Sequence, residues 1–164
     1  MEQTPFILPQ MLAPFYKRLL NWFTDLVLIF LLTVALGLTG NYLADVYGVE
    51  YLRMGDFVVE NSKINFFYFF CSIMFYGLFE SYLQRTPGKF LTGTRVIRLD
   101  GAKPTEWNIL LRTLLRFIPF EALSFMGAYP IGFHDSLSRT LVIDIYKYER
   151  ELQRQRHKQQ KTDI

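Results

Sequence analysis

The chain has 164 residues, 18 of them basic and 15 acidic, and its formal net charge is +3. A single cysteine, Cys71, excludes a disulfide framework and a cysteine-ligated zinc cluster, and the small net charge gives no indication of nucleic-acid binding. The charged residues are unevenly distributed, because residues 19–44 and 64–79 together contain only one of them, Asp25. A soluble domain distributes charge over every amphipathic element, so this pattern predicts membrane spans.

The first elements along the chain are a leader and two spans. Residues 1–14 contain three prolines, which predict an irregular or short amphipathic leader. The apolar block that follows is too long for a secretory signal. The spans are expected at residues 19–38 and 64–83. Twenty residues of helix reach about 30 Å, which is the thickness of the hydrocarbon core of a bilayer.

The charges between and after the spans predict their orientation. The 39–63 loop has four acidic and two basic residues, whereas residues 84–106 contain five Lys or Arg. By the positive-inside rule, the amino terminus and residues 84–106 are cytoplasmic and the 39–63 loop lies outside. The basic tail, residues 147–164, is also expected inside, as a solvated helix or a disordered segment that could contact anionic lipid.

Two alternating segments predict a pair of β-strands on the cytoplasmic side. They are TRVIRL, residues 94–99, and TLVIDI, residues 140–145. We expect residues from about 94–100 to pair with 139–146 in an antiparallel sheet.

The segment between these strands, residues 105–129, predicts short helices joined at a bend. Thr105 is a candidate N-cap, Pro119 ends or kinks the first helix, and Arg112 and Arg116 lie on one polar stripe. Residues 107–133 together are too polar for a single span, so they are expected to cross twice, to dip into the membrane or to lie on its cytoplasmic face. The predicted fold is a mainly α-helical integral membrane protein with two transmembrane helices, this amphipathic or re-entrant helical hairpin and a short β pair.

Asp25 is the most informative single residue, because it lies inside the first predicted span. A carboxylate near the middle of a membrane costs about 2.5–3.5 kcal/mol on insertion scales, so it needs a partner. Arg18 is too far along the same helix to bond to it, which makes Arg112 or Arg116 the expected cation. Asp25 is then either a polar lock between helices or an ion or proton site.

Several charged residues are expected near the same side of the membrane as Asp25. Four acids and four bases could form one charge network that docks the third segment onto the two spans. Its predicted members are Arg18, Asp25, Glu80, Lys89, Arg112, Arg116, Glu121 and Asp135.

Other motifs do not indicate catalysis. The sequence RTPGK, residues 85–89, lacks the glycine and hydroxyl residues of a phosphate-binding loop, and its Pro87-Gly88 pair predicts a tight turn. His134-Asp135 has no second histidine near it in sequence, so it does not predict a metal site. We therefore expect neither an enzyme nor a bound metal or cofactor.

The order of these motifs resembles the RDD family of small bacterial membrane proteins. The resemblance rests on Arg18 and Asp25 in the first span, TPGK at 86–89, TRVIRLDG at 94–101 and HDSLSRTLV at 134–142. It covers roughly residues 15–146, and Asp135 resembles the second Asp of the family name. It implies a multi-pass protein of the bacterial inner membrane with poorly defined function, suspected to act in transport, with some members proposed as sodium/proton antiporters.

Two functional hypotheses follow for a single membrane-embedded domain, residues 1–146, and its tail. The first is transport of a small cation or proton, with Asp25 as the embedded acid. Two spans and one dip cannot enclose a pathway alone, so transport requires a homo-oligomer or a membrane partner. The second is a non-catalytic scaffold or accessory subunit in which the charge network only holds the fold. Both place the protein in membrane lipid with its two termini in the cytoplasm.

Overall fold

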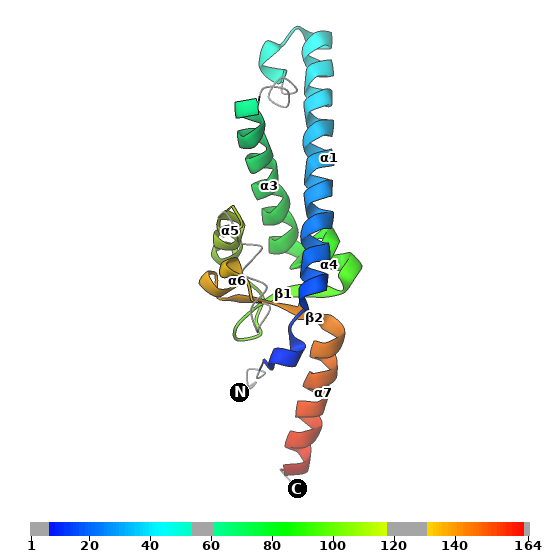
Figure 1. Cartoon of the computed structure of the whole chain (residues 1–164), viewed down its shortest axis with the longest axis vertical. Coiled ribbons are helices and arrows are strands. Elements are labelled where there is room, and N and C mark those ends of the chain that lie inside the picture. The colour runs from blue at the N-terminus through cyan, green and yellow to red at the C-terminus, as the bar shows by residue number, and fades with distance from the viewer. Residues whose placement is uncertain (1–6, 54–60, 118–130, 163–164) are drawn as a thin grey trace.

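The computed structural model describes residues 7–53, 61–117 and 131–162. The molecule is elongated and mainly helical, with two long helices side by side and a small sheet near one end of them (Figure 1). The last helix continues beyond the sheet, away from the two long helices. The sheet end holds most of the chain's short elements and, as shown below, its buried charges.

Helix α1 (Phe15–Tyr47) contains the first predicted span but is much longer than residues 19–38. The helix continues because residues 39–47 contain no proline, and it ends at Gly48, whose φ of 67° is the left-handed conformation typical of a helix C-cap. The first part of the predicted 39–63 loop is therefore helical. The short 3-10 helix η2 (Glu50–Leu52) follows and contacts α1.

Helix α3 (Asn61–Leu83) runs back along α1 and includes the second predicted span. Ile29 of α1 packs against Phe75 and Tyr76 of α3 in a small apolar core. Among the described residues, α1 is the one helix that is both long and apolar enough to cross a membrane, while the apolar stretch Phe67–Leu83 of α3 is shorter.

The predicted strand pair is confirmed, with slightly shorter strands. Strand β1 (Thr94–Arg98) pairs antiparallel with β2 (Thr140–Asp144), and Val96 lies opposite Val142. The leader contributes the 3-10 helix η1 (Pro9–Met11) and then adds to the sheet, because the Ala13 amide donates to the Val142 carbonyl at 2.9 Å. The described part of the leader, residues 7–14, is packed, since Met11 and Ala13 are fully buried.

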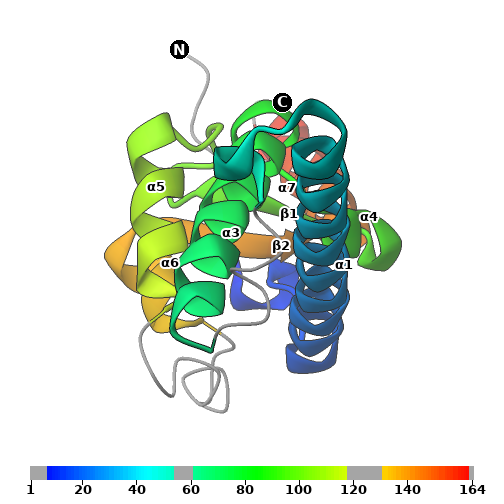
Figure 2. The same cartoon turned by 90° about the horizontal axis from the view of Figure 1, so that it is seen from above.

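Three short helices complete the sheet end. They are α4 (Pro87–Thr92), α5 (Glu106–Leu115) and α6 (Phe133–Leu137). Seen from above, α3 lies between α5 and α1, with α4 on the far side of α1 (Figure 2).

One expectation for these short segments needs correction. The tight turn predicted at Pro87-Gly88 is wrong, because Thr86 caps a helix there and Pro87 occupies its first turn, where a missing N–H costs nothing. Helix α5 ends at Leu115 with Arg116 as its C-cap, whereas Pro119, expected to end or kink the helix, lies outside the described residues. The remainder of the 105–129 segment, from residue 118 onward, lies outside the described residues.

The basic tail forms helix α7 (Ile145–Thr162), which begins directly after β2. Of the two alternatives for this segment, the structure therefore has the solvated helix. It contacts η1 and β2 at its start and then extends away from the rest of the chain.

Candidate functional site

Six of the eight predicted network residues meet where α1 and α3 reach the sheet end. We call them the ionic cluster, and ion pairs join all of them: Arg18, Glu80, Lys89, Arg112, Arg116 and Asp135. They come from α1, α3, α4, α5 and α6, with Arg116 at the C-cap of α5. All are buried except Arg116, whose side chain is 15% exposed. Two predicted members remain. Glu121 lies outside the described residues, and Asp25 is described below.

Glu80 of α3 is fully buried and is surrounded by cations from two other elements. Its carboxylate accepts from Lys89 Nζ at 2.9 Å, Arg112 Nε at 3.1 Å and Arg116 Nη2 at 2.7 Å. An unpaired carboxylate in this position would be strongly destabilising. Glu80 therefore ties α4 and α5 to the end of α3.

Asp135 of α6 is the second buried acid. It accepts from Arg18 of α1 and from Arg112, and His134 Nε2 lies 3.1 Å from its Oδ1. Burial alone would raise the pKa of Asp135, but the charges of Arg18, His134 and Arg112 outweigh it and hold the pKa well below its usual value. Asp135 therefore remains ionised at neutral pH.

Arg112 connects the two acids and lies at the centre of the cluster. Its Nε donates to Glu80, and its Nη1 donates to Asp135 and, at 2.6 Å, to Thr140 Oγ1 of β2. Helix α5 aims this side chain inward because Thr105 and Asn108 form a capping box at its start, and the Asn108 side chain donates to the Ser138 carbonyl at 2.9 Å. One guanidinium thus links α5, α3, α6 and the sheet.

Asp25 lies beside the cluster but has different partners from those expected. Its carboxylate is 1% exposed and accepts from Thr86 Oγ1 at 2.6 Å and from the Gly88 amide at 2.9 Å. Among the described residues, no ion pair joins Asp25 to Arg112 or Arg116. A hydroxyl and a backbone N–H at the start of α4 therefore satisfy the acid, which fastens α4 to α1.

This contact explains the residues of the TPGK sequence. Thr86 caps α4 and donates to Asp25, and Pro87 begins the helix. Gly88 passes so close to α1 that an added Cβ would lie 2.7 Å from the Asn21 carbonyl oxygen and 2.9 Å from Asp25 Oδ1. Lys89 reaches Glu80, and burial lowers the pKa of Lys89 while the Glu80 carboxylate opposes that shift.

Sequence reasoning missed several polar residues of the site. Asn21 of α1 donates to Thr94 Oγ1 at 2.9 Å and accepts from Thr92 Oγ1 at 2.5 Å. The sequence pattern could have identified Asn21, because Arg18, Asn21 and Asp25 are spaced so that they lie on one face of a helix. No helix-face spacing of polar residues surrounds His134 in the sequence, so only the folded structure shows that it lies in the site.

A cavity of about 60 Å³ opens between these elements, and residues of the ionic cluster line it together with Asp25. Two guanidinium nitrogens of residues that line the cavity are buried without a hydrogen-bond partner, Arg112 Nη2 and Arg116 Nη1. A third such nitrogen, Arg95 Nε, belongs to β1 and does not line the cavity. Arg116 also lies over the Tyr76 ring, 3.8 Å from its centroid. Among the residues that the structure describes, no group of three or more His, Cys, Asp or Glu could hold a metal ion.

The chain matches a known protein family over most of its length. The family model of the RDD family matches residues 12–145, a range that contains the ionic cluster and Asp25. No curated protein sequence and no solved structure is significantly similar to the chain.

Proposed function

Because the chain belongs to the RDD family, we propose that it is an integral membrane protein that acts as a non-catalytic scaffold or accessory subunit. In this proposal the ionic cluster and Asp25 hold the fold together rather than conduct ions. The observation that carries it is the closed state of Asp25, which is buried and accepts two hydrogen bonds from α4.

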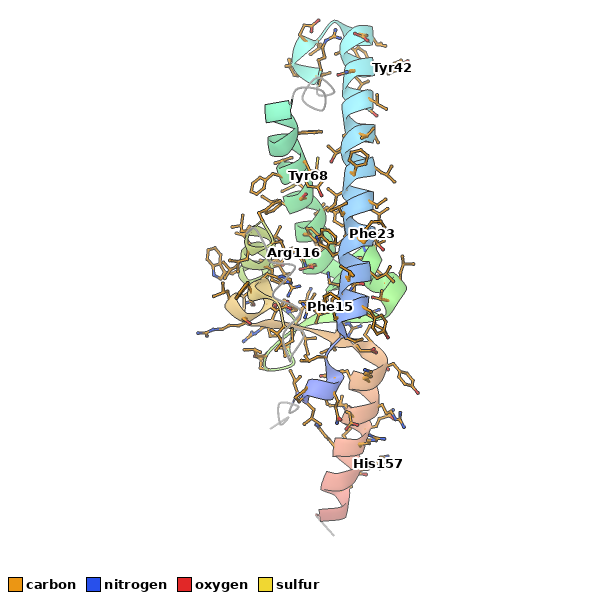
Figure 3. All side chains as sticks on the ribbon, in the orientation of Figure 1. Phe15, Phe23, Tyr42, Tyr68, Arg116 and His157 are labelled. Carbon is orange, nitrogen blue, oxygen red and sulfur yellow. The ribbon has the colours of Figure 1, made fainter. Side chains whose placement is uncertain are left out.

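The surface of α1 supports a membrane position. Apart from Thr39, its exposed side chains between Trp22 and Tyr42 are apolar, and they include Phe23, Val27 and Phe30. Trp22 and Tyr42 are themselves exposed and lie twenty positions apart, which is about 30 Å along a helix. That distance equals the hydrocarbon thickness, and Trp and Tyr are enriched at both membrane surfaces. Figure 3 shows Tyr42 near one end of α1 and Phe15 near the other.

The charges favour one orientation in the bacterial inner membrane. The sheet end carries the basic 84–106 segment and the basic helix α7, so we assign it to the cytoplasm together with both termini. The ionic cluster then lies at the cytoplasmic membrane surface, where it fastens α4, α5 and α6 to the two spans. The scaffold role leaves the outer loop and α7 available for a membrane partner protein.

A structural role explains why Asp25 is tolerated so close to the lipid. Its two bonds come from groups fixed by the fold, the cap hydroxyl and the Gly88 amide. Binding and releasing a cation at Asp25 in each cycle would compete with these two bonds, which help to hold α4 on α1. A buried polar group without partners costs about 1–3 kcal/mol, so such a cycle is unfavourable.

Ion flux in proteoliposomes tests this proposal. Purified wild-type protein and the Asp25→Asn variant are reconstituted, and sodium and proton movement are compared with empty liposomes. The scaffold proposal expects no flux above empty liposomes for either protein and a lower melting temperature for the variant. Coupled flux by the wild type would overturn it.

Transport of a small cation or proton is the second candidate function, and one observation favours it. Asp25 lines the cavity together with Tyr76 and Lys89, so an ionisable group reaches a space that could admit an ion. Two spans do not enclose a pathway, so transport would require a homo-oligomer or a membrane partner. Flux that is present in the wild type and lost in a folded Asp25→Asn variant would support this candidate.

A further inference from the structure

We propose that the cavity in the ionic cluster binds a small monovalent anion of the size of chloride or formate, held between Arg112 Nη2 and Arg116 Nη1. The proposal rests on the cluster and its cavity, and it does not depend on the scaffold or transport role. It therefore stands or fails separately from the proposed function.

The first argument is the charge balance around the cavity. Its lining includes four basic side chains, those of Arg18, Lys89, Arg112 and Arg116, together with His134 and one acid, Asp25. The two acids that pair with these bases, Glu80 and Asp135, raise the number of carboxylates to three. One positive charge remains in excess in a buried region, where an uncompensated charge is costly.

The second argument is the pair of donors without acceptors. Arg112 Nη2 and Arg116 Nη1 are buried and have no hydrogen-bond partner. The two residues lie four positions apart at the end of α5, so their side chains share one face. Buried donors are almost always satisfied, and an anion would satisfy both nitrogens and neutralise the excess charge at once.

The size of the cavity limits the ligand. A water molecule needs at least about 10–15 Å³ of such space, so a volume of about 60 Å³ holds a few waters or one small anion. A sugar acid such as gluconate is too large. The carboxylate of Asp25 also faces the cavity, but its charge is included in the balance above, and Thr86 and Gly88 already donate to it.

The test uses the full chain in detergent. Its melting temperature is measured against increasing sodium chloride, sodium formate, sodium sulfate and sodium gluconate at constant ionic strength, and chloride binding is followed by the broadening of its chlorine NMR signal. We expect saturable stabilisation by chloride and by formate, broadening of the chlorine signal by the protein, and no saturable stabilisation by sulfate or gluconate. Equal effects of all four salts on the melting temperature would indicate screening alone and overturn the proposal. An unbroadened chlorine NMR signal would mean that the cavity holds only water, and it would overturn the proposal as well.

A conservative variant locates the site. Arg116→Lys keeps the positive charge beside Glu80 but removes the second guanidinium nitrogen, and it should weaken chloride binding roughly tenfold or more. Arg98→Lys, on an exposed ion pair with Asp100, is the matched control and should bind like the wild type. If Arg116→Lys does not fold, the wild-type broadening and salt series still decide the matter. Equal affinity in a folded Arg116→Lys protein would contradict the proposed position.

Discussion

At the scale of single residues, small groups in this chain have large structural consequences because helices approach closely at the sheet end. Gly88 is the clearest case, since its missing side chain allows the Asp25 carboxylate to accept the Gly88 amide hydrogen. The buried acids show the same dependence, because Glu80 and Asp135 are stable only while several cations surround each of them.

Replacement of Gly88 by alanine should therefore destabilise the protein. The new Cβ would lie 2.7 Å from a backbone oxygen of α1, and such overpacking costs about 1–3 kcal/mol. Gly77→Ala in α3 is the control, because a Cβ there has nothing within 4 Å and alanine favours helix. Thermal unfolding in detergent should show a lower melting temperature for Gly88→Ala only, and equal behaviour of the two variants would contradict the contact.

The low pKa of Asp135 in the folded chain predicts that acid destabilises the protein. Its pKa in the folded chain lies well below the usual value of 3.8, so the unfolded chain takes up this proton first as the pH falls. The stability that Asp135 contributes is complete above about pH 4 and is lost as the pH falls further toward the folded pKa. Unfolding measured from pH 7 downward should show a shallower acid loss for Asp135→Asn than for the wild type. The exposed-site variant Asp100→Asn should keep the wild-type slope, and a wild-type slope in Asp135→Asn would refute the assignment.

At the scale of elements, the fold depends on a few side chains that join short pieces to the two long helices. Helix α5 has ten residues, a length that is marginal for a helix on its own. Its contacts with α3 and α6 therefore stabilise it, and Arg112 provides the central ones.

Arg112→Gln should detach these elements. The change leaves Glu80 and Asp135 buried with one cation fewer, and breaking a buried pair costs about 3–5 kcal/mol. Arg98→Gln removes the same charge from an exposed pair and should change stability little. Yield and melting temperature in detergent measure the difference, and similar values for the two variants would exclude a central role for Arg112.

The sequence was sufficient for those elements whose pattern is local. Two segments with partial alternation predicted β1 and β2 and their pairing, and the absence of charge predicted the apolar parts of α1 and α3. The acids and bases of the ionic cluster could be named because buried charges require opposite charges. The partners of Asp25 could not, because a backbone amide donates one of its bonds and no sequence pattern marks which amide comes near.

At the scale of the whole molecule, the uneven distribution of charge along the sequence corresponds to two different parts of the structure. The apolar surface of α1 lies between two levels marked by Trp22 and Tyr42, while the buried charges collect at the sheet end. Belonging to the RDD family is consistent with this arrangement. The molecule thus separates an exposed apolar part from a compact polar part in which the long helices end.

The proposed orientation predicts which sites an impermeant thiol reagent reaches. Single cysteines replace exposed residues in a Cys71→Ser background: Glu50→Cys next to the outer end of α1, Ala102→Cys after β1 and Gln153→Cys in α7. In intact cells only the cysteine at position 50 should react, and all three should react after lysis. Labelling at position 153 in intact cells would reverse the assigned orientation.

The central claim is that Asp25 is present to fasten α4 to α1, and a double-mutant cycle between Asp25 and Thr86 tests it most directly. The free energy of unfolding is measured for Asp25→Asn, Thr86→Val, the double variant and the wild type. Because the two side chains bond to each other at 2.6 Å, the account predicts that each single change destabilises the protein and that the double variant loses less than the sum, with a coupling of about 1–3 kcal/mol. Losses that simply add, or an Asp25→Asn protein as stable as the wild type, would contradict it.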